Sequence, residues 1–464
     1  MVKLSRFAHS FDLGDSVAMY HSLRMKPVFL KREQYEKLRE CLANSSYCSI
    51  NDFPDSIQEE MCELAKYKII TQSPDEDERV LSFIKSISPK PAISVCYMIL
   101  SEQCNLACKY CFLGNNDPDK RARFSVGNMT EEMAEKAIDF FIRQIRQSDN
   151  DSPENHPVVI FYGGEPLLNF PVLDYVASRI NEMKAHVDSI KNVEMSVITN
   201  GVLLDRTKLL RLQELGVSIA ISVDGCTEQT NEMRVDRLDA PVFPRIISVL
   251  DECKELGVDI SLSVTLTEET VKNPSNVLAL IDQYGIKGFG FNILMPDESF
   301  SLSQDYNEEA ARFIIDSFIE LRDRGVYEDR MMRKLKAFSK AQVYFSDCAA
   351  TSGSQIVIAP DGRVGICHGC LSSKEFFVST IFDDEFNATE NSDFVEWSKT
   401  TPIHKPECLS CAALGICGGG CPVNAMQLRP GNTIHSLDER FCVHAKETLE
   451  FLISDLYRII TKEQ

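Results

Sequence analysis

Residues 93–112, ISVCYMILSEQCNLACKYCF, join an apolar segment to three closely spaced cysteines. Ile93–Leu100 is rich in aliphatic residues and ends at polar positions, which predicts a buried β-strand. Cys104, Cys108 and Cys111 follow with CxxxCxxC spacing. Three thiolates on one short loop can ligate three irons of a cubane cluster and leave the fourth iron open. A structural zinc site is the alternative, and it would require a fourth Cys or His ligand close to these three.

The strand pattern recurs along the chain to about residue 325, with helical periods between the strands. In Thr130–Arg146 the apolar residues fall on one helix face, and Thr130 is placed to cap the first turn. This alternation predicts an α/β fold with a parallel sheet, either doubly wound or curled into a partial barrel. The further strand candidates are Val158–Tyr162, Val193–Thr199, Val217–Val223, Asp259–Thr267 and Gly288–Leu294.

Short polar motifs follow these strands, where functional residues of parallel α/β folds gather. After the second strand comes Gly163-Gly164-Glu165-Pro166; paired glycines permit close approach of a ligand, and Glu165 could receive an ammonium group. The third strand ends in Thr199-Asn200-Gly201, and the fourth in Ser222-Val223-Asp224-Gly225. Ser222 and Arg234 are candidate carboxylate binders. Each is individually more often a turn, cap or salt-bridge residue, and only their joint placement favours a ligand site.

Composition excludes several classes of protein. The chain has 464 residues, 44% hydrophobic and 25% charged, which is typical of a folded protein with several domains. A net charge of -20 disfavours a nucleic-acid partner. A run of about eighteen apolar residues, which a membrane-spanning helix needs, is missing, so no membrane partner is expected. The opening segment lacks the apolar core of a secretory signal, which predicts a cytoplasmic protein.

The seventeen cysteines are an odd number, and cytoplasmic thiols stay reduced, so a disulfide framework is disfavoured. Eight of them lie between Cys348 and Cys442, in a segment dense in Gly, where metal ligation would compensate for a small core. Six others are scattered, and we expect them to be small buried hydrophobic residues. These are Cys41, Cys48, Cys62, Cys96, Cys226 and Cys253.

We expect three domains: residues 1–90, 91–325 and 326–464. The first contains strand-like stretches at Ser16–Tyr20 and Pro27–Leu30. They precede helical patterns at Arg32–Leu42 and Ser56–Tyr67, and the polar, acidic segment Ser73–Arg79 indicates a turn or linker. A small α+β, winged-helix-like module of this kind could bind a peptide as an added strand, or it could be a simple packing domain. The chain closes with a predicted amphipathic helix, Ala445–Ile460.

Between residues 91 and 325, the CxxxCxxC loop with its following aromatic residue, GGEP, TNG and SVDG together resemble the radical S-adenosylmethionine (SAM) superfamily. The resemblance implies a partial (β/α)6 barrel in which a [4Fe–4S] cluster, ligated by Cys104, Cys108 and Cys111, binds SAM and cleaves it to a 5′-deoxyadenosyl radical. Asn231 stands where relatives often carry His and is not included. The implied SAM contacts are Phe112, Gly163, Gly164, Glu165, Thr199, Asn200, Ser222, Asp224, Arg234 and Leu294.

The C-terminal cysteines resemble the SPASM extension, which carries two auxiliary [4Fe–4S] clusters, so three clusters are expected in total. The resemblance implies that one auxiliary cluster is held by Cys408, Cys411, Cys417 and Cys442, and the other by Cys348, Cys367 and Cys421. Cys370 either completes the latter set or leaves one iron open for a substrate thiolate, which a metal would hold deprotonated.

The whole arrangement resembles the thioether-forming maturases of ribosomally made peptides, of the sactipeptide and ranthipeptide type. This implies a Cys-containing precursor peptide with a leader, and a flavodoxin- or ferredoxin-type reductant. A carbon–carbon crosslinker and a sulfatase-type formylglycine maturase are alternatives within the superfamily. An iron–sulfur electron carrier or a zinc protein is the alternative of another class. The catalytic residues are unknown; Asp347, His368 and Tyr344 are candidate bases, although such side chains are usually structural.

Overall fold

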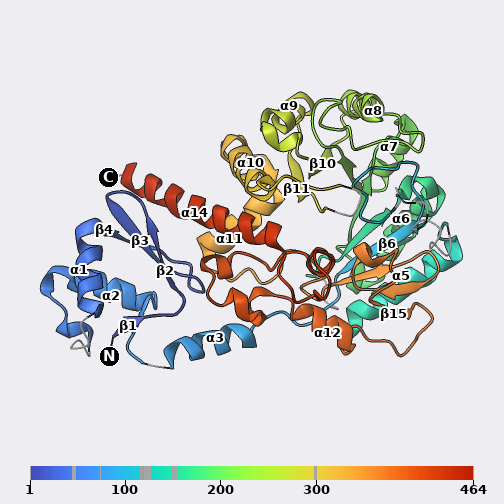
Figure 1. Cartoon of the computed structure of the whole chain (residues 1–464). Coiled ribbons are helices and arrows are strands. Elements are labelled where there is room, and N and C mark those ends of the chain that lie inside the picture. Colours follow the sequence, from blue (N-terminus) through green and yellow to red (C-terminus); the bar gives the residue numbers. More distant parts are fainter. Residues whose placement is uncertain are drawn as a thin grey trace. The chain divides into compact units, whose positions relative to one another are not determined.

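The computed structural model describes residues 2–43, 49–73, 75–114, 117, 119, 127–148, 154–296 and 300–462. The chain divides into two compact units. The first comprises Met1–Pro89, Met331–Cys348 and Lys399–Gln464, and the second comprises Lys90–Arg330 and Ala349–Ser398 (Figure 1). Within the described ranges, no helix is both long and apolar enough to cross a membrane.

The second unit is built on a sheet of strand order β12-β11-β10-β9-β8-β7-β6-β13-β14-β15. The strands from β6 to β11 pair in parallel and in chain order, without the reversal that a doubly wound sheet requires. This order fits the partial barrel. All six predicted strands are confirmed, with ends that differ by no more than two residues: β6 (Val95–Ser101), β7 (Val158–Gly163), β8 (Glu194–Thr199), β9 (Val217–Ser222), β10 (Ile260–Leu266) and β11 (Gly288–Ile293).

Helices connect these parallel strands, as the alternating pattern predicts (Figure 1). In the first of them, Thr130 Oγ1 accepts a hydrogen bond from Met133 N at 3.2 Å, which confirms the predicted cap. Ala134, Ala137, Ile138 and Phe141 of this helix are buried on the face that the sequence assigns to the core. The helices are α5 (Glu131–Gln147), α6 (Phe170–Met183), α7 (Arg206–Glu214), α8 (Phe243–Leu256), α9 (Ser275–Tyr284) and α10 (Tyr306–Leu321).

The sequence analysis missed the extension of this sheet beyond β6. Strand β13 (Gln355–Ile358) pairs in parallel with β6, and Ile356 lies opposite Cys96. Strands β14 (Arg363–Gly365) and β15 (Phe377–Thr380) continue the sheet in antiparallel fashion. The strand that leads into the cysteine loop therefore has a neighbour on each side. The remaining elements of this unit are β12 (Tyr327–Glu328) and α12 (Ser392–Ser398).

The first unit contains the antiparallel sheet β2-β3-β4. The two predicted strands correspond to β3 (Ser16–His21) and β4 (Val28–Lys31), and the two predicted helices to α1 (Arg32–Ala43) and α2 (Gln58–Lys66). Strand β2 (Ala8–Asp12) was missed. So were the short pair β1 (Lys3–Leu4) and β5 (Ile70–Thr71).

The predicted linker at Ser73–Arg79 is wrong beyond Asp75, because α3 (Glu76–Ser86) begins there. Its first turn holds Glu76, Asp77 and Glu78, and acidic residues stabilise a helix amino terminus. Pro74, within the same segment, lies outside the described residues.

Strand β3 faces two hydrophobic cores. Val17 and Met19 pack among the apolar residues of the N-terminal segment, whereas Ala18 and Tyr20 pack with residues from the C-terminal part of the unit. The Tyr20 ring stacks on Phe338, with ring centroids 6.3 Å apart. The first ninety residues therefore share a core with α11 (Asp329–Lys340) and with the C-terminal helix α14 (Glu439–Lys462), which runs beside the β2–β4 sheet (Figure 1).

The predicted C-terminal helix is confirmed as α14, which begins before Ala445. Among the scattered cysteines, Cys41, Cys96 and Cys253 are buried as predicted. The prediction is wrong for Cys62, which is exposed on α2. It is also wrong for Cys226, which is half-buried in a loop where its thiol donates to Ser275 O at 3.8 Å. Cys48 lies outside the described residues.

Candidate active site

The three cysteines of the CxxxCxxC loop gather directly after β6. The Cys104 thiol interacts electrostatically with the thiols of Cys108 and Cys111, so the three groups converge. Burial raises the pKa of Cys104 and raises that of Cys108 to about 11. Buried thiols become thiolates readily only when a cation such as a metal ion compensates their charge. The donor set therefore fits an iron–sulfur cluster, whose irons are each ligated by a separate thiolate.

Within the described ranges, no three His, Cys, Asp or Glu side chains are grouped so as to surround one metal ion. A mononuclear site needs that grouping, whereas a cubane cluster holds its ligands apart on different irons. The observation therefore gives no support to the zinc alternative.

The glycines of the GGEP motif allow two backbone segments to approach each other. A Cβ on Gly163 would overlap Ser101 O, and one on Gly164 would overlap Gln103 O. Gly164 N donates to Ser101 O at 2.9 Å, and Glu165 N donates to Gln103 O at 2.8 Å. The expected reason for these glycines was close approach of a ligand. The structure adds that the approaching group is the chain that enters the cysteine loop.

We predict that Gly164→Ala displaces the cysteine loop and lowers SAM cleavage per bound iron about 100-fold, because small displacements of reacting groups are costly. The assay is 5′-deoxyadenosine formation normalised to iron content. Gly257→Ala is the control, since a Cβ there meets nothing within 4 Å. It should lower stability by roughly 1 kcal/mol without affecting the rate, because its backbone φ is +65°. An unchanged rate in Gly164→Ala would contradict this role.

Glu165 connects the second and third strand ends. Its carboxylate accepts hydrogen bonds from Thr199 Oγ1 at 2.7 Å, Leu167 N at 3.0 Å and Asn200 N at 2.8 Å. Burial raises the pKa of Glu165 to about 7, although these donors oppose the shift. Asn200 Nδ2 donates to Asn105 Oδ1 at 2.9 Å and to Cys104 Sγ at 3.7 Å. The structure therefore brings Glu165, Thr199 and Asn200 together beside the cysteine loop, as the sequence analysis expects of a common site.

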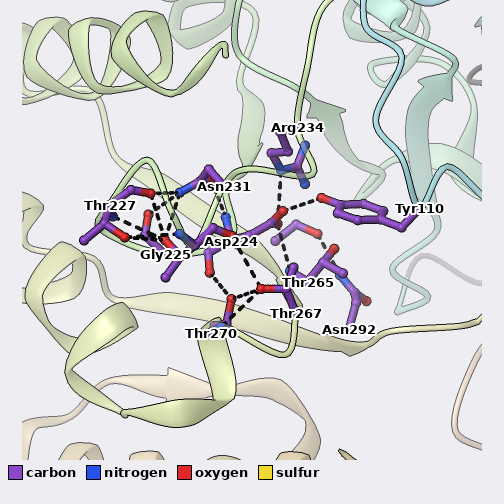
Figure 2. A network of polar contacts seen from close by, with 12 residues as sticks. Tyr110, Asp224, Gly225, Thr227, Asn231, Arg234, Thr265, Thr267, Thr270 and Asn292 are labelled. Carbon is purple, nitrogen blue, oxygen red and sulfur yellow. Dashed lines mark hydrogen bonds and ion pairs between the residues drawn. The ribbon is translucent and has the colours of Figure 1, made fainter. Parts of the chain in front are cut away.

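Asp224 and Arg234 form a buried ion pair, with Arg234 Nε 3.0 Å from Asp224 Oδ1 (Figure 2). Tyr110, between the second and third cysteines of the loop, donates its hydroxyl to Asp224 Oδ2 at 2.5 Å. The sequence analysis missed Tyr110, although an aromatic residue between two cluster cysteines was a visible signal. Asn231 has a structural role, because its side chain accepts from Asp224 N and donates to Gly225 O.

Three further implied SAM contacts, Ser222, Leu294 and Phe112, lie on the segments that follow the parallel strands or at their ends. Ser222 is the last residue of β9 and is half-buried. Leu294 is buried after β11, where its backbone N–H donates a hydrogen bond to the Tyr306 hydroxyl at 2.8 Å. Phe112 is 41% exposed.

The candidate base His368 lies in a cluster of aromatic rings. Its ring stacks on Tyr97 at a centroid distance of 4.4 Å and contacts Tyr162 at 4.8 Å and Phe112 at 5.9 Å. Burial lowers the pKa of His368 to about 4, so the ring is neutral near pH 7. The other candidates, Asp347 and Tyr344, belong to the first unit and contact each other, with Tyr344 Oη donating to Asp347 Oδ1 at 3.4 Å.

Four C-terminal cysteines gather within the first unit. The Cys408 thiol interacts electrostatically with those of Cys417, Cys442 and Cys411. Burial raises the pKa of Cys408 and of Cys442 to about 12. In the second unit, the Cys367 thiol hydrogen bonds to Cys370. Cys348 and Cys421 belong to the first unit, so the ligand set of another auxiliary cluster is divided between two units and stays a prediction.

Two buried lysines border the four gathered thiols. Lys334 is 0% exposed and Lys405 is 2% exposed. Lys334 Nζ donates to Cys417 O at 3.0 Å and lies 3.8 Å from Asp347 Oδ1. Lys405 Nζ donates to Ser436 O at 3.0 Å. Asp347 compensates the charge of Lys334. Lys405 interacts electrostatically with the thiols of Cys408, Cys417 and Cys442, so its environment fits thiolates that carry a metal cluster better than neutral thiols.

Comparison with known proteins agrees with this geometry. Residues 98–281 match the radical SAM superfamily. This part of the chain is a radical SAM domain. The superfamily implies SAM and a [4Fe–4S] cluster, for which the converging thiols of Cys104, Cys108 and Cys111 are a fitting donor set.

The similarity to two relatives extends beyond the residues of the radical SAM domain. The chain is 23% identical to the radical SAM cyclopropyl synthase TigE of Paramaledivibacter caminithermalis, over 82% of this chain and 75% of the relative. It is 25% identical to the cysteine-type anaerobic sulfatase-maturating enzyme of Clostridium perfringens strain 13, over 71% of this chain and 89% of the relative.

Two solved structures share the radical SAM fold. The sulfatase-maturating enzyme anSMEcpe with bound AdoMet superimposes with a TM-score of 0.64 and 21% identity, covering 79% of this chain and 98% of its own. SuiB of Streptococcus suis, bound to its precursor peptide SuiA, superimposes with a TM-score of 0.51 and 16% identity, covering 95% of this chain and 99% of its own.

Proposed function

We propose that the protein installs thioether crosslinks, between a Cys sulfur and an acceptor carbon, in a ribosomally synthesised precursor peptide with a leader. The observation that carries the proposal is the antiparallel sheet β2-β3-β4. Its outer strands each pair with one neighbour only, in the part of the chain that the structure describes. An edge strand of this kind can bind an extended peptide by main-chain hydrogen bonds. SuiB, whose structure holds its precursor peptide, covers more of this chain than anSMEcpe does.

The proposed reaction breaks a C–H bond of the acceptor residue and the S–H bond of a peptide cysteine, and forms a C–S bond. When bound, SAM and its cluster supply a carbon radical that abstracts the hydrogen atom. The thiol hydrogen would leave as a proton. An auxiliary iron–sulfur cluster, which the C-terminal cysteines would hold, would supply the acceptor for the remaining electron. Three [4Fe–4S] clusters and a flavodoxin- or ferredoxin-type reductant complete the proposal.

The chain's own residues would perform three tasks. Cys104, Cys108 and Cys111 hold the SAM cluster, and Glu165 and Arg234 bind the charged groups of the SAM methionine. Tyr97, Tyr162 and His368 form an aromatic cluster, and Tyr162 interacts electrostatically with Cys367; we propose that this cluster faces the substrate. Aromatic rings around a reacting radical exclude water and so protect it from side reactions.

The test is anaerobic incubation of the intact enzyme with a Cys-containing precursor peptide, SAM and dithionite, followed by mass spectrometry. We expect each crosslink to remove two hydrogen atoms and to protect one cysteine from iodoacetamide. A leaderless peptide is the substrate control and should react poorly. Unchanged peptide mass despite 5′-deoxyadenosine formation would contradict the proposal.

The sulfatase-type maturase is the second candidate, because the Clostridium perfringens enzyme is similar over most of its length. It would convert a peptide cysteine to an aldehyde, which reacts with a hydrazide probe. A carbon–carbon crosslinker would also remove two hydrogens but would leave every cysteine open to iodoacetamide. The same mass spectra therefore separate all three activities.

Removing residues 1–90 does not distinguish these candidates. The removal would expose Phe338, Leu449 and Ile453, which share a core with Ala18 and Tyr20. Loss of activity would then report unfolding of the first unit and not loss of leader binding. The leaderless peptide leaves the enzyme intact and avoids this ambiguity.

A further inference from the structure

Asp224, which follows the end of β9, joins the cysteine loop to the segment that carries Arg234 (Figure 2). Its side chain is completely buried. One carboxylate oxygen, Oδ2, accepts the Tyr110 hydroxyl at 2.5 Å. The other, Oδ1, lies 3.0 Å from Arg234 Nε and accepts Thr265 N at 3.3 Å. Protein groups thus approach both carboxylate oxygens, so Asp224 is held in place by contacts within the protein.

Arg234 has a complementary arrangement. Its side chain is 6% exposed, its Nε faces Asp224, and its guanidinium lies 5.6 Å from the centre of the Tyr110 ring. No acceptor among the described residues hydrogen bonds to its terminal nitrogens. A buried guanidinium with an oriented Nε and unoccupied terminal nitrogens is suited to bind a carboxylate in a fixed direction.

The backbone reinforces the same connection. Lys109 N donates to Met233 O at 2.8 Å, and Ala107 N donates to Val235 O at 2.9 Å. Arg237 Nε donates to Cys104 O at 2.9 Å. The segment around Arg234 therefore runs along the cysteine loop, and the Tyr110–Asp224 hydrogen bond is the buried side-chain contact between the loop and the end of β9.

We propose that Asp224 is a positioning residue that fixes the cysteine loop through Tyr110 and the Arg234 guanidinium through the ion pair. The Asp224 carboxylate thereby keeps the cysteine loop and the terminal nitrogens of Arg234, which would bind the SAM carboxylate, in a constant position relative to each other. A loop fixed on one side only would let SAM bind with its carboxylate misplaced relative to the cluster, which is costly for reactivity. The proposal concerns the radical SAM domain and is independent of the peptide chemistry.

The test compares Tyr110→Phe, Asp224→Asn and the double variant with the parent protein, all reconstituted anaerobically. Hydrogen exchange of the 104–111 amides is measured without SAM, and the SAM dissociation constant by equilibrium dialysis. Each single variant should speed loop exchange and weaken SAM binding about tenfold, the usual effect of losing a charge-assisted hydrogen bond. The double variant should show less than the sum of the two single effects, because both substitutions weaken the same hydrogen bond.

Two matched controls lie on α6. Tyr175 Oη donates to Glu135 Oε2 at 2.9 Å, and Asp174 Oδ2 lies 2.8 Å from Arg211 Nε. Tyr175→Phe and Asp174→Asn remove the same chemical groups from a partly exposed network and should leave loop exchange and SAM affinity unchanged. The change that SAM causes in the EPR spectrum of the reduced cluster should also be altered in Asp224→Asn at equal iron content, but not in Asp174→Asn.

Unchanged loop exchange and SAM affinity in Tyr110→Phe would overturn the proposal, even if Asp224→Asn does not fold. Equal effects in the α6 controls would also overturn it, because they would show general destabilisation of the domain. Additive effects in the double variant would show that Tyr110 and Asp224 act separately, which contradicts the shared anchor.

Discussion

Replacing Cys104, Cys108 and Cys111 together with alanine should abolish SAM cleavage. We expect 5′-deoxyadenosine formation to fall below about one thousandth of the parent rate, because a reaction that depends on a metal centre has no route without its ligands. The three thiols converge after β6, and no other described cysteine lies on that loop. The measurement is chromatographic quantification of 5′-deoxyadenosine with dithionite as reductant.

The control for this variant is Cys226→Ala, which removes a half-buried thiol of the same domain whose hydrogen-bond partner is Ser275 O. It should retain the parent rate. The triple variant should still bind iron and sulfide, because the thiols of Cys408, Cys411, Cys417 and Cys442 are unchanged. Complete loss of iron from the triple variant would argue against auxiliary clusters, and an unchanged rate would place the reacting cluster elsewhere.

Tyr20→Ala should destabilise the first unit by about 3–5 kcal/mol, the usual cost of removing a large aromatic side chain from a packed core. Tyr20 is 0% exposed and packs against Phe338 and Phe11. Its hydroxyl is buried without a hydrogen-bond partner. Tyr20→Phe removes that unsatisfied group and should therefore be neutral or slightly stabilising.

Equilibrium unfolding in urea, followed by circular dichroism and by exchange of the α14 amides, measures this effect. Because Tyr20 shares its core with Leu449 and Ile453, the midpoint for α14 should shift together with that of the N-terminal sheet. Phe83→Ala is the control; Phe83 is 56% exposed, so its loss should change stability by no more than about 0.5 kcal/mol. A shift confined to the N-terminal sheet would show that residues 1–89 unfold on their own.

In the second unit, strands could be predicted from the sequence where the apolar segment was long enough and had turn residues on both sides. The six strands from β6 to β11 are six or seven residues of mostly apolar sequence between turn residues, and their identity does not depend on distant partners. Strand β13, with only Gln355–Ile358, is too short to be distinguished locally, and it is a strand because β6 lies beside it. The chain-order pairing that separates a barrel from a doubly wound sheet is likewise a long-range property.

The candidate site was predictable as a set of motifs but not as a network. Cysteine spacing predicted the loop, the strand ends predicted Glu165 and Asn200, and Arg234 was predicted from its place ten residues after Asp224. Tyr110 was missed because its role depends on Asp224, more than a hundred positions away in sequence. The burial of Lys334 and Lys405 also could not be predicted from the sequence, because lysine is normally exposed and only tertiary packing buries it.

The discontinuous first unit has a consequence for biosynthesis. Because chains emerge from the ribosome amino terminus first, β3 is synthesised long before α14, with which it packs. Until α14 has been synthesised, the apolar side of β3 that carries Ala18 and Tyr20 lacks its native partner from this helix. The nascent protein must therefore keep that surface from aggregating over the several hundred residues that separate the two elements.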